Sequence, residues 1–446
     1  MIRIPAAQHP RFSRLALMLR AFKYRNYRLF FGGQSVSLIG TWMQSVAMSW
    51  LVYRMTGSAL FLGVAGFAAQ VPAFLLSPFT GVFADRYSKH RILIITQSLA
   101  MLQAFSLAAL VLAGKAQVWH IITLSALLGV VNAFDVPARQ AFVIEMVERK
   151  EDLGNAIALN SSMFNSARLL GPSIAGVIIS VMGEGLCFLM NGISYLAVIA
   201  ALLAMELTPR KKEPALTTVL QRLNEGFNYT FGFAPIKFIV LLVALTSLTA
   251  MPYTVLMPIF AKDILGGGPG TLGFLMAFSG IGALAAALSL TARKNVAGLE
   301  KRIPLAAGVF GLGIIGLSFS RNFPVSAACI AMASFGMVSQ MASSNTIIQT
   351  VTDDDKRGRV MAFYTMAFMG MAPFGSLLAG WTAERLGAPA TIRLSGVMAI
   401  AGALAFSSRL EKIKKSVRPV YARLGIIPQI AAGIETASEL GVPQEN

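Results

Sequence analysis

Charged residues are scarce in this 446-residue sequence: 13% of the residues are Asp, Glu, Lys or Arg, whereas 55% are hydrophobic. Soluble domains carry roughly 25% charged residues. A soluble protein of this length with so few charges would lack the polar side chains that its surface needs. The composition therefore excludes an ordinary soluble protein and predicts that much of the surface contacts lipid.

Cysteine and histidine are also rare. The two cysteines, Cys187 and Cys329, fall inside apolar runs, which favours packing over a disulfide or a metal site. The three histidines, His9, His90 and His120, are scattered along the chain. We therefore expect no metal and no cofactor, and the sequence offers no nucleophile–base pair that would indicate an enzyme.

Acidic residues are outnumbered, which gives the chain a net charge of +18. The basic residues lie between the apolar runs rather than in one patch, so we expect no nucleic-acid partner. Residues 1–28 are basic but contain no apolar core followed by a cleavage site, which argues against a secretory signal. The helical spacing of Phe12, Leu15, Leu19 and Phe22 instead predicts a short amphipathic helix on the membrane surface.

Twelve runs are long and apolar enough to cross a bilayer, for which a helix needs about 20 residues. Strands of a membrane barrel would be about ten residues long with alternating polarity. The expected spans are 28–53, 59–84, 92–113, 118–141, 155–181, 183–205, 236–262, 270–292, 303–320, 323–350, 359–384 and 388–409. The predicted fold class is an all-α integral membrane protein with twelve transmembrane helices in two six-helix halves.

The distribution of basic residues predicts the orientation. With the N-terminus inside, 31 of the 38 Lys and Arg residues fall in cytoplasmic segments, 6 fall in outside loops, and Arg168 lies within a span. Because cytoplasmic loops of membrane proteins carry an excess of Lys and Arg, both termini are expected to be cytoplasmic.

Five segments follow from this plan. They are a cytoplasmic amphipathic N-terminus (1–27), an N-terminal six-helix bundle (28–205), a cytoplasmic linker (206–235), a C-terminal six-helix bundle (236–410) and a cytoplasmic tail (411–446). Leu216, Leu220, Leu223 and Phe227 recur at helical spacing and predict an amphipathic helix in the linker. The tail is expected to be mostly without regular structure.

The two halves carry a faint internal repeat. A shift of 204 residues places VERKEDLGNA (147–156) on VTDDDKRGRV (351–360). The same shift places Gly171 and Gly176 on Gly375 and Gly380. Two halves related by sequence are typical of transporters.

Polar residues inside the first expected span lie on one face. Gln34, Ser37, Thr41 and Gln44 are spaced by three, four and three residues. Polar side chains in hydrocarbon are costly unless they face a partner or a cavity. This face either forms hydrogen bonds to a neighbouring helix or lines a water-filled path for a substrate.

Arg168 lies near the middle of the fifth expected span and shares a face with Phe164 and Gly171. An arginine facing lipid would cost at least ~2.5–3.5 kcal/mol, so it is expected to face the interior. It could contact an anionic group of a substrate, take part in proton coupling, or form a structural hydrogen bond. Asn165, on the same helix, is a further candidate for substrate contact.

No carboxylate lies at mid-membrane. Asp135, near the cytoplasmic end of the fourth span, is the best candidate for an ionisable switch. A structural pair with Arg139, four residues later, is the alternative.

The segment GVFADRYSKHR (81–91) resembles the signature loop of the major facilitator superfamily, in which a glycine precedes Asp-Arg and a run of basic residues. Gly81, Asp85, Arg86, Lys89 and Arg91 match this pattern. The resemblance implies that these five residues gate the cytoplasmic side. Such contacts form in one conformation and break in the other.

ARLLGPSIAG (167–176) resembles the antiporter motif of the same superfamily, in which glycines surround a Gly-Pro pair. Gly171, Pro172 and Gly176 are the matching residues and are expected to bend the helix and allow close packing. Three further segments, at 26–58, 132–142 and 155–172, resemble the enterobactin-exporter-like branch.

This resemblance implies a proton-coupled exporter of a siderophore- or drug-like molecule in the bacterial cytoplasmic (inner) membrane, acting as a monomer. The fourth span lacks the central arginine motif of proton-coupled multidrug antiporters, so the coupling ion stays open. A lysophospholipid flippase of the same fold is the main alternative. A non-transporting membrane receptor or enzyme has no residue pattern in its favour.

The gating interpretation makes a testable prediction. Asp85→Asn removes the charge that the signature loop needs, so transport should be lost while the protein still reaches the membrane at a normal level. Transport in vesicles, normalised to the amount of protein, measures this. Normal transport by the variant would contradict the gating role.

Overall fold

The computed structural model of the protein describes residues 19–206, 219–293 and 296–426. Within these ranges the chain is almost entirely helical and contains no strand. The all-α prediction is therefore confirmed. The amphipathic helix expected around Phe12 lies mostly outside the described residues.

Six long helices form the N-terminal half, preceded by a short 3-10 helix, η1 (Arg20–Lys23). They are α2 (Arg25–Thr56), α3 (Ala59–Arg86), α4 (Lys89–Leu112), α5 (Val118–Glu145), α6 (Lys150–Met182) and α7 (Glu184–Leu203). The sequence sets their ends. Gly57 ends α2 in the left-handed conformation (φ 61°), and the Ser58 hydroxyl caps α3 by accepting from the Phe61 N–H.

The C-terminal half repeats this plan with two interrupted spans. Its segments are α8 (Val219–Gly232), α9 (Ala234–Thr249), η2 (Met251–Leu256), α10 (Met257–Ile259), η3 (Phe260–Ile264), α11 (Pro269–Thr291), α12 (Leu299–Phe319), α13 (Phe323–Val351), α14 (Asp354–Thr365), η4 (Met366–Gly370), α15 (Ala372–Leu386), α16 (Ala388–Ser407) and α17 (Leu410–Arg423). Pro252 and Pro373 lie at the breaks, because proline cannot donate the next helical hydrogen bond.

The backbone supports the internal repeat. Gly183 joins α6 to α7 and Gly387 joins α15 to α16, and the two glycines are 204 residues apart. Both have φ of +81°, which residues with a side chain rarely adopt. Corresponding turns in the two halves therefore use the same backbone conformation.

Eleven helical segments in the described part of the chain are long and apolar enough to cross a membrane. The remaining expected span is α2, which at 32 residues is about 48 Å long but more polar than the others. Its polar side chains include Gln34, Ser37 and Gln44, and these are buried inside the N-terminal half. The helix is thus screened from lipid on that face.

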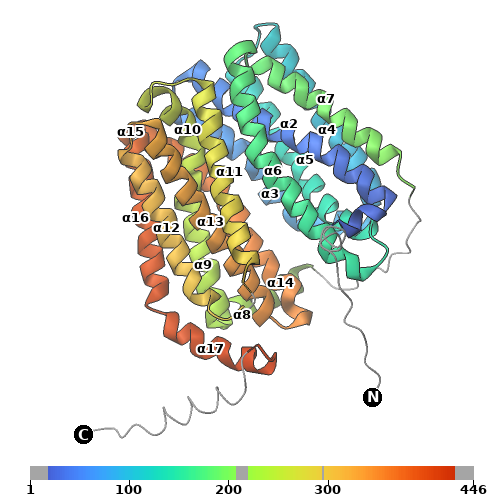
Figure 1. Ribbon diagram of the computed structural model, residues 1–446, viewed down its shortest axis with the longest axis vertical. Helices are drawn as coiled ribbons and strands as arrows, with labels where there is room; N and C mark the ends of the chain where they lie inside the picture. The colour runs from blue at the N-terminus through green and yellow to red at the C-terminus, as the bar shows by residue number, and fades with distance from the viewer. Residues whose placement is uncertain (1–18, 207–218, 294–295, 427–446) are drawn as a thin grey trace, which may run out of the picture.

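The two halves meet from one end of the bundle to about its middle, where Arg168 contacts Ser279 and Phe74 contacts Phe374. We call the end that carries η1, α8 and α17 the linker end, and the opposite end the far end; the ribbons converge at the far end and diverge at the linker end (Figure 1). A single apolar cluster, including Leu62 and Ala379, contains residues of both halves. At the linker end each half has its own cluster, around Phe142 in one and Ile303 in the other.

Glycines bring the halves into backbone contact on two sides. At the α6–α11 crossing, a Cβ on Gly273 would lie 2.5 Å from the Pro172 carbonyl oxygen and 2.7 Å from the Gly176 Cα. At the α3–α15 crossing, a Cβ on Gly63 would lie 2.9 Å from the Gly380 Cα. No side chain fits at these positions without moving the helices apart.

Hydrogen bonds reinforce the closed far end. The Glu384 carboxylate of α15 accepts from the Ser58 hydroxyl (3.0 Å) and from the Leu60 N–H (3.1 Å) at the start of α3. The Tyr53 hydroxyl donates to Asp263 across the same end. The carboxylate at the helix N-terminus also faces the positive end of the α3 dipole.

Two helices lie along the linker end. The expected linker helix is present as α8, and Glu225 and Phe227 of this helix contact Arg359 and Phe363 of α14. Leu216 lies outside the described residues. The tail was expected to be mostly irregular, and for residues 410–423 this is wrong, because they form α17.

Helix α17 forms because its sequence is amphipathic. Ile413, Val417 and Tyr421 recur every four residues and are buried against the C-terminal half, whereas the Lys412 side of the helix is exposed. The high charge of this segment hid the pattern that holds it in place.

The glycine crossings generate a prediction. Gly273→Ala should force α6 and α11 apart and shift the protein toward a form with an open far end. The distance between spin labels at Val181 of α6 and Leu386 of α15, measured by pulsed EPR, should then increase or broaden. Gly154→Ala is the matched control, because a Cβ at this glycine of α6 meets no atom within 4 Å. Unchanged distances in Gly273→Ala would mean that this crossing does not hold the far end closed.

Candidate functional site

Arg168 lies where the two halves meet, at about the middle of α6. Its Nη2 donates to the Ser279 Oγ of α11 at 3.3 Å. Ser279 is 2.6 Å from the Ser334 Oγ of α13, and the Ser334 Oγ is 3.1 Å from the Tyr253 hydroxyl of η2. A polar chain therefore runs from the N-terminal half into the core of the C-terminal half.

The side chains that contact Arg168 carry no charge. Ser279, Ser334 and Tyr253 are all buried, and the Trp42 ring of α2 lies 5.9 Å from the guanidinium carbon. No acidic side chain pairs with Arg168 among the described residues. A cation in such an environment is stable only if an anion or several hydrogen bonds compensate for the lost water. The arrangement therefore favours an anionic ligand beside Arg168.

The motif that follows Arg168 sets how α6 packs. Gly171 faces α2, where a Cβ would lie 2.5 Å from the Trp42 Cβ. Gly176 faces α11, where a Cβ on Gly176 would lie 3.0 Å from the Gly273 Cα. Pro172 lies inside the helix and has no N–H to give to the carbonyl of Arg168. The motif thus packs α6 closely against α2 of its own half and against α11 of the other half.

The polar face of α2 does not line a path in this structure. The Gln44 amide donates to Gln103 of α4 (2.9 Å) and accepts from Asn191 of α7 (2.8 Å). Thr41 lies 3.5 Å from the Tyr195 hydroxyl, and Gln34 is buried. Of the two interpretations, the structure supports hydrogen bonding between helices, because α2 turns this face toward α4 and α7.

Asp135 and Arg139 form an ion pair on α5, with Nε 3.2 Å from the carboxylate. The other carboxylate oxygen of Asp135 accepts from Thr96 (2.9 Å) and Gln97 (2.7 Å) of α4. All three residues that bind the Asp135 carboxylate belong to the N-terminal half. This is the pairing alternative that the sequence left open.

The signature segment is described only in part. Residues 81–86 lie in the last turns of α3, and the side chains of Gly81, Asp85 and Arg86 are outside the described residues. Lys89 forms an ion pair with Glu145 at 2.5 Å, which joins α4 to α5 at the linker end. Arg91 is exposed. The gating role of these residues stays a prediction.

Asn165 of α6 donates to the Ser161 carbonyl of its own helix at 2.9 Å. It is partly exposed and one turn from Arg168 toward the linker end. Phe164, which is exposed, packs edge-on against Trp42 with ring centroids 5.8 Å apart. Asn165 thus stays near Arg168 without sharing its hydrogen bonds.

Sequence reasoning missed the partners of Arg168. Ser279, Ser334 and Tyr253 are single polar residues in long apolar runs, and no pattern links them to the fifth span. It also missed Asp263 and Glu384, whose hydrogen bonds join the two halves at the far end. Their positions at helix ends on the same side were the one available signal.

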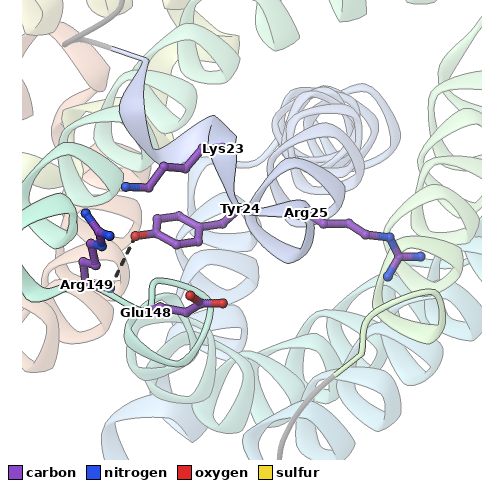
Figure 2. A pocket seen from close by; sticks show the side chains of 5 residues that line it. All are labelled: Lys23, Tyr24, Arg25, Glu148 and Arg149. Carbon is purple, nitrogen blue, oxygen red and sulfur yellow. Dashed lines mark hydrogen bonds between the residues drawn. The ribbon is translucent and has the colours of Figure 1, made fainter.

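A polar cavity of about 410 Å³ lies at the linker end of the N-terminal half, lined by Lys23, Tyr24, Arg25, Glu148 and Arg149 (Figure 2). The Tyr24 hydroxyl donates to Asp152 of α6 at 2.8 Å and accepts from the Arg149 N–H at 3.3 Å. The hydrogen bond from Lys23 to Asp152 raises the pKa of Lys23 above its usual value. These contacts anchor the start of α2, and the cavity contains none of the predicted site residues.

Known proteins are similar to this chain in sequence and in fold. Residues 18–425 match the family described as transmembrane secretion effector. The staphyloferrin A transporter of Staphylococcus aureus (strain NCTC 8325 / PS 47) is 29% identical over 87% of this chain and 97% of its own length. Macrolide efflux protein A of Streptococcus pyogenes is 26% identical over 85% of this chain and 95% of its own length.

A solved structure of a bacterial homologue of the human lysosomal transporter Spinster, in an inward-facing and unoccupied conformation, is also similar. It aligns with a TM-score of 0.65 at 11% identity and covers 92% of this chain and 99% of that one. The family match spans most of the sequence, and the relatives align over nearly their whole length. The chain therefore belongs to the transmembrane secretion effector family of the major facilitator superfamily, and it is a transporter rather than an enzyme.

Proposed function

We propose that this protein exports a small anionic or amphipathic organic molecule, of siderophore or drug type, by alternating access in exchange for protons. The observation that carries the proposal is Arg168, a cation at the interface of the two halves with no acidic partner among the described residues. An anionic group of the substrate would supply the missing charge. The named substrates of the two relatives, a siderophore and a macrolide, are consistent with this class.

The conformation fits one stage of such a cycle. The halves share an apolar cluster at the far end and have separate clusters at the linker end. If the linker end is cytoplasmic, as the basic residues predict, this is the inward-open state that loads substrate. The similar Spinster homologue is also inward-facing.

Transport then requires the far end to open. The contacts that would break are the glycine crossings and the hydrogen bonds of Asp263 and Glu384. Separation of α6 from α11 would also remove Ser279 from Arg168, which couples the binding residue to the movement of the halves. Gating on the cytoplasmic side by Asp85, Arg86 and Arg91 belongs to the opposite stage.

Proton coupling rests on the family resemblance and on the acids that close the far end. Asp263 and Glu384 would lose their partners when that end opens, and each could then take a proton from outside. Asp135 is less suited to this role, because its partners Arg139, Thr96 and Gln97 all belong to one half.

The proposal predicts the effect of Arg168→Gln in proteoliposomes that carry a pH gradient. A hydrogen bond to a charged group contributes ~1.5–3 kcal/mol, so the variant should lose about tenfold or more in substrate-dependent proton flux for anionic substrates. Siderophores, macrolides and lysophospholipids are the substrates to compare.

Arg393→Gln is the matched control. Arg393 of α16 also donates to a serine, the Ser318 Oγ at 3.3 Å, but both residues lie within the C-terminal half. The substrate-dependent proton flux of Arg393→Gln should equal that of the wild type. Equal flux in Arg168→Gln would reduce Arg168 to a packing residue. Lysophospholipid movement without export of a soluble substrate would instead identify a flippase.

A further inference from the structure

A second cavity, of about 450 Å³, lies at the linker end of the C-terminal half, between α11, α12 and α13. Three basic side chains line it: Arg293, Lys301 and Arg302. The remaining lining is mostly apolar. The transport site beside Arg168 shares no residue with this cavity.

The basic residues of this cavity have no acidic partner among the described residues. Arg302 is half-buried, and its guanidinium donates only to neutral groups, the Ser289 hydroxyl and the Ser339 Oγ (3.3 Å). Two acids lie nearby: Glu300 accepts from the Gly298 N–H, and Glu411 pairs with Lys414 and also lies near enough to Lys301 to interact with its charge. Arg293 and Arg302 thus face one space without an acidic partner in the part of the chain that the structure describes.

The internal repeat makes this arrangement informative. The corresponding region of the N-terminal half carries its own anions: Asp135 binds Arg139, and Glu145 binds Lys89. A shift of 204 residues replaces each acid by a neutral residue: Asp85 by Ser289, Asp135 by Ser339 and Glu145 by Gln349. By this shift, three carboxylates of the N-terminal half correspond to neutral residues of the C-terminal half, whereas Lys89 corresponds to a second cation, Arg293.

The apolar lining indicates which kind of anion fits. Leu305, Val309 and Phe335 form one side of the cavity. Leu305 is 69% exposed, and Leu312, seven residues later on the same face of α12, is 55% exposed. Because α12 spans the membrane, this leucine face continues from the cavity along the helix surface that lipid chains would contact. A free anion would make no contact with this leucine face. A phospholipid would place its headgroup in the cavity and an acyl chain along the leucines.

We propose that this cavity binds the headgroup of an anionic phospholipid, with Arg302 contacting the phosphate, Arg293 and Lys301 beside it, and an acyl chain along Leu305 and Leu312. Basic pockets between membrane helices at the level of the headgroups recognise anionic lipids in this way. The lipid replaces the internal acids of the N-terminal half. It would hold the ends of α11, α12 and α13 together at the linker end.

Native mass spectrometry of the delipidated full-length protein tests this, with phosphatidylglycerol and phosphatidylcholine supplied at equal concentration. The wild type should retain phosphatidylglycerol at least tenfold more than phosphatidylcholine, because each of the three basic residues near an anionic headgroup contributes about 1 kcal/mol and tenfold requires about 1.4 kcal/mol. Ser339→Asp places a carboxylate beside Arg302, as Asp135 stands beside Arg139. This variant should lose the preference and remain folded.

Ser339→Asn is the matched control, with nearly the same shape and no charge, and should keep the preference. Thermal unfolding of both variants verifies folding, and phosphatidylglycerol should raise the midpoint for wild type and Ser339→Asn only. Equal retention of the two lipids by the wild type would overturn the proposal. The proposal would also be overturned if Ser339→Asp retained phosphatidylglycerol as the wild type does, or if inorganic phosphate alone abolished the rise of the unfolding midpoint that phosphatidylglycerol causes.

Discussion

The close backbone contact of glycines at the far end is the constraint on which the arrangement of the two halves depends. Gly176 against Gly273 and Gly63 against Gly380 bring helices of opposite halves nearer than any side chain would permit. Small residues drive helix association in membranes, where lipid removes the hydrophobic advantage of larger ones. Because both crossings lie at the far end, the halves can separate at the linker end without breaking them.

Arg168 differs from the polar networks of the N-terminal half, because no acidic side chain among the described residues balances its charge. Gln44, Gln103 and Asn191 complete one another's hydrogen bonds inside the N-terminal half, and Asp135 does the same with Arg139. Such networks hold helices in a fixed arrangement. Arg168 differs, because its protein contacts are one serine and one aromatic ring. The same physical rule that makes the first group structural makes Arg168 the candidate for contact with a substrate.

The two halves share a backbone plan but not an electrostatic one. The turns at Gly183 and Gly387 have the same φ and are separated by the 204 residues of the repeat. At the linker end, however, carboxylates accompany the bases of the N-terminal half, whereas serines accompany Arg302. The difference is local to Arg302: among the described residues it lacks the carboxylate partner that Arg139 and Lys89 have, although ion pairs such as Glu225–Arg359 form elsewhere at the linker end of the C-terminal half.

The sequence by itself determined the membrane class, the helical spans, the repeat and the family, because each depends on composition, run length or local motifs. It also predicted that Arg168 faces the interior. Only the tertiary structure decided what each face meets: Gln44 turns toward α7, and Arg168 reaches Ser279, 111 residues away in the chain. Helical periodicity specifies which residues share a face, but the neighbour of that face depends on how all the helices pack.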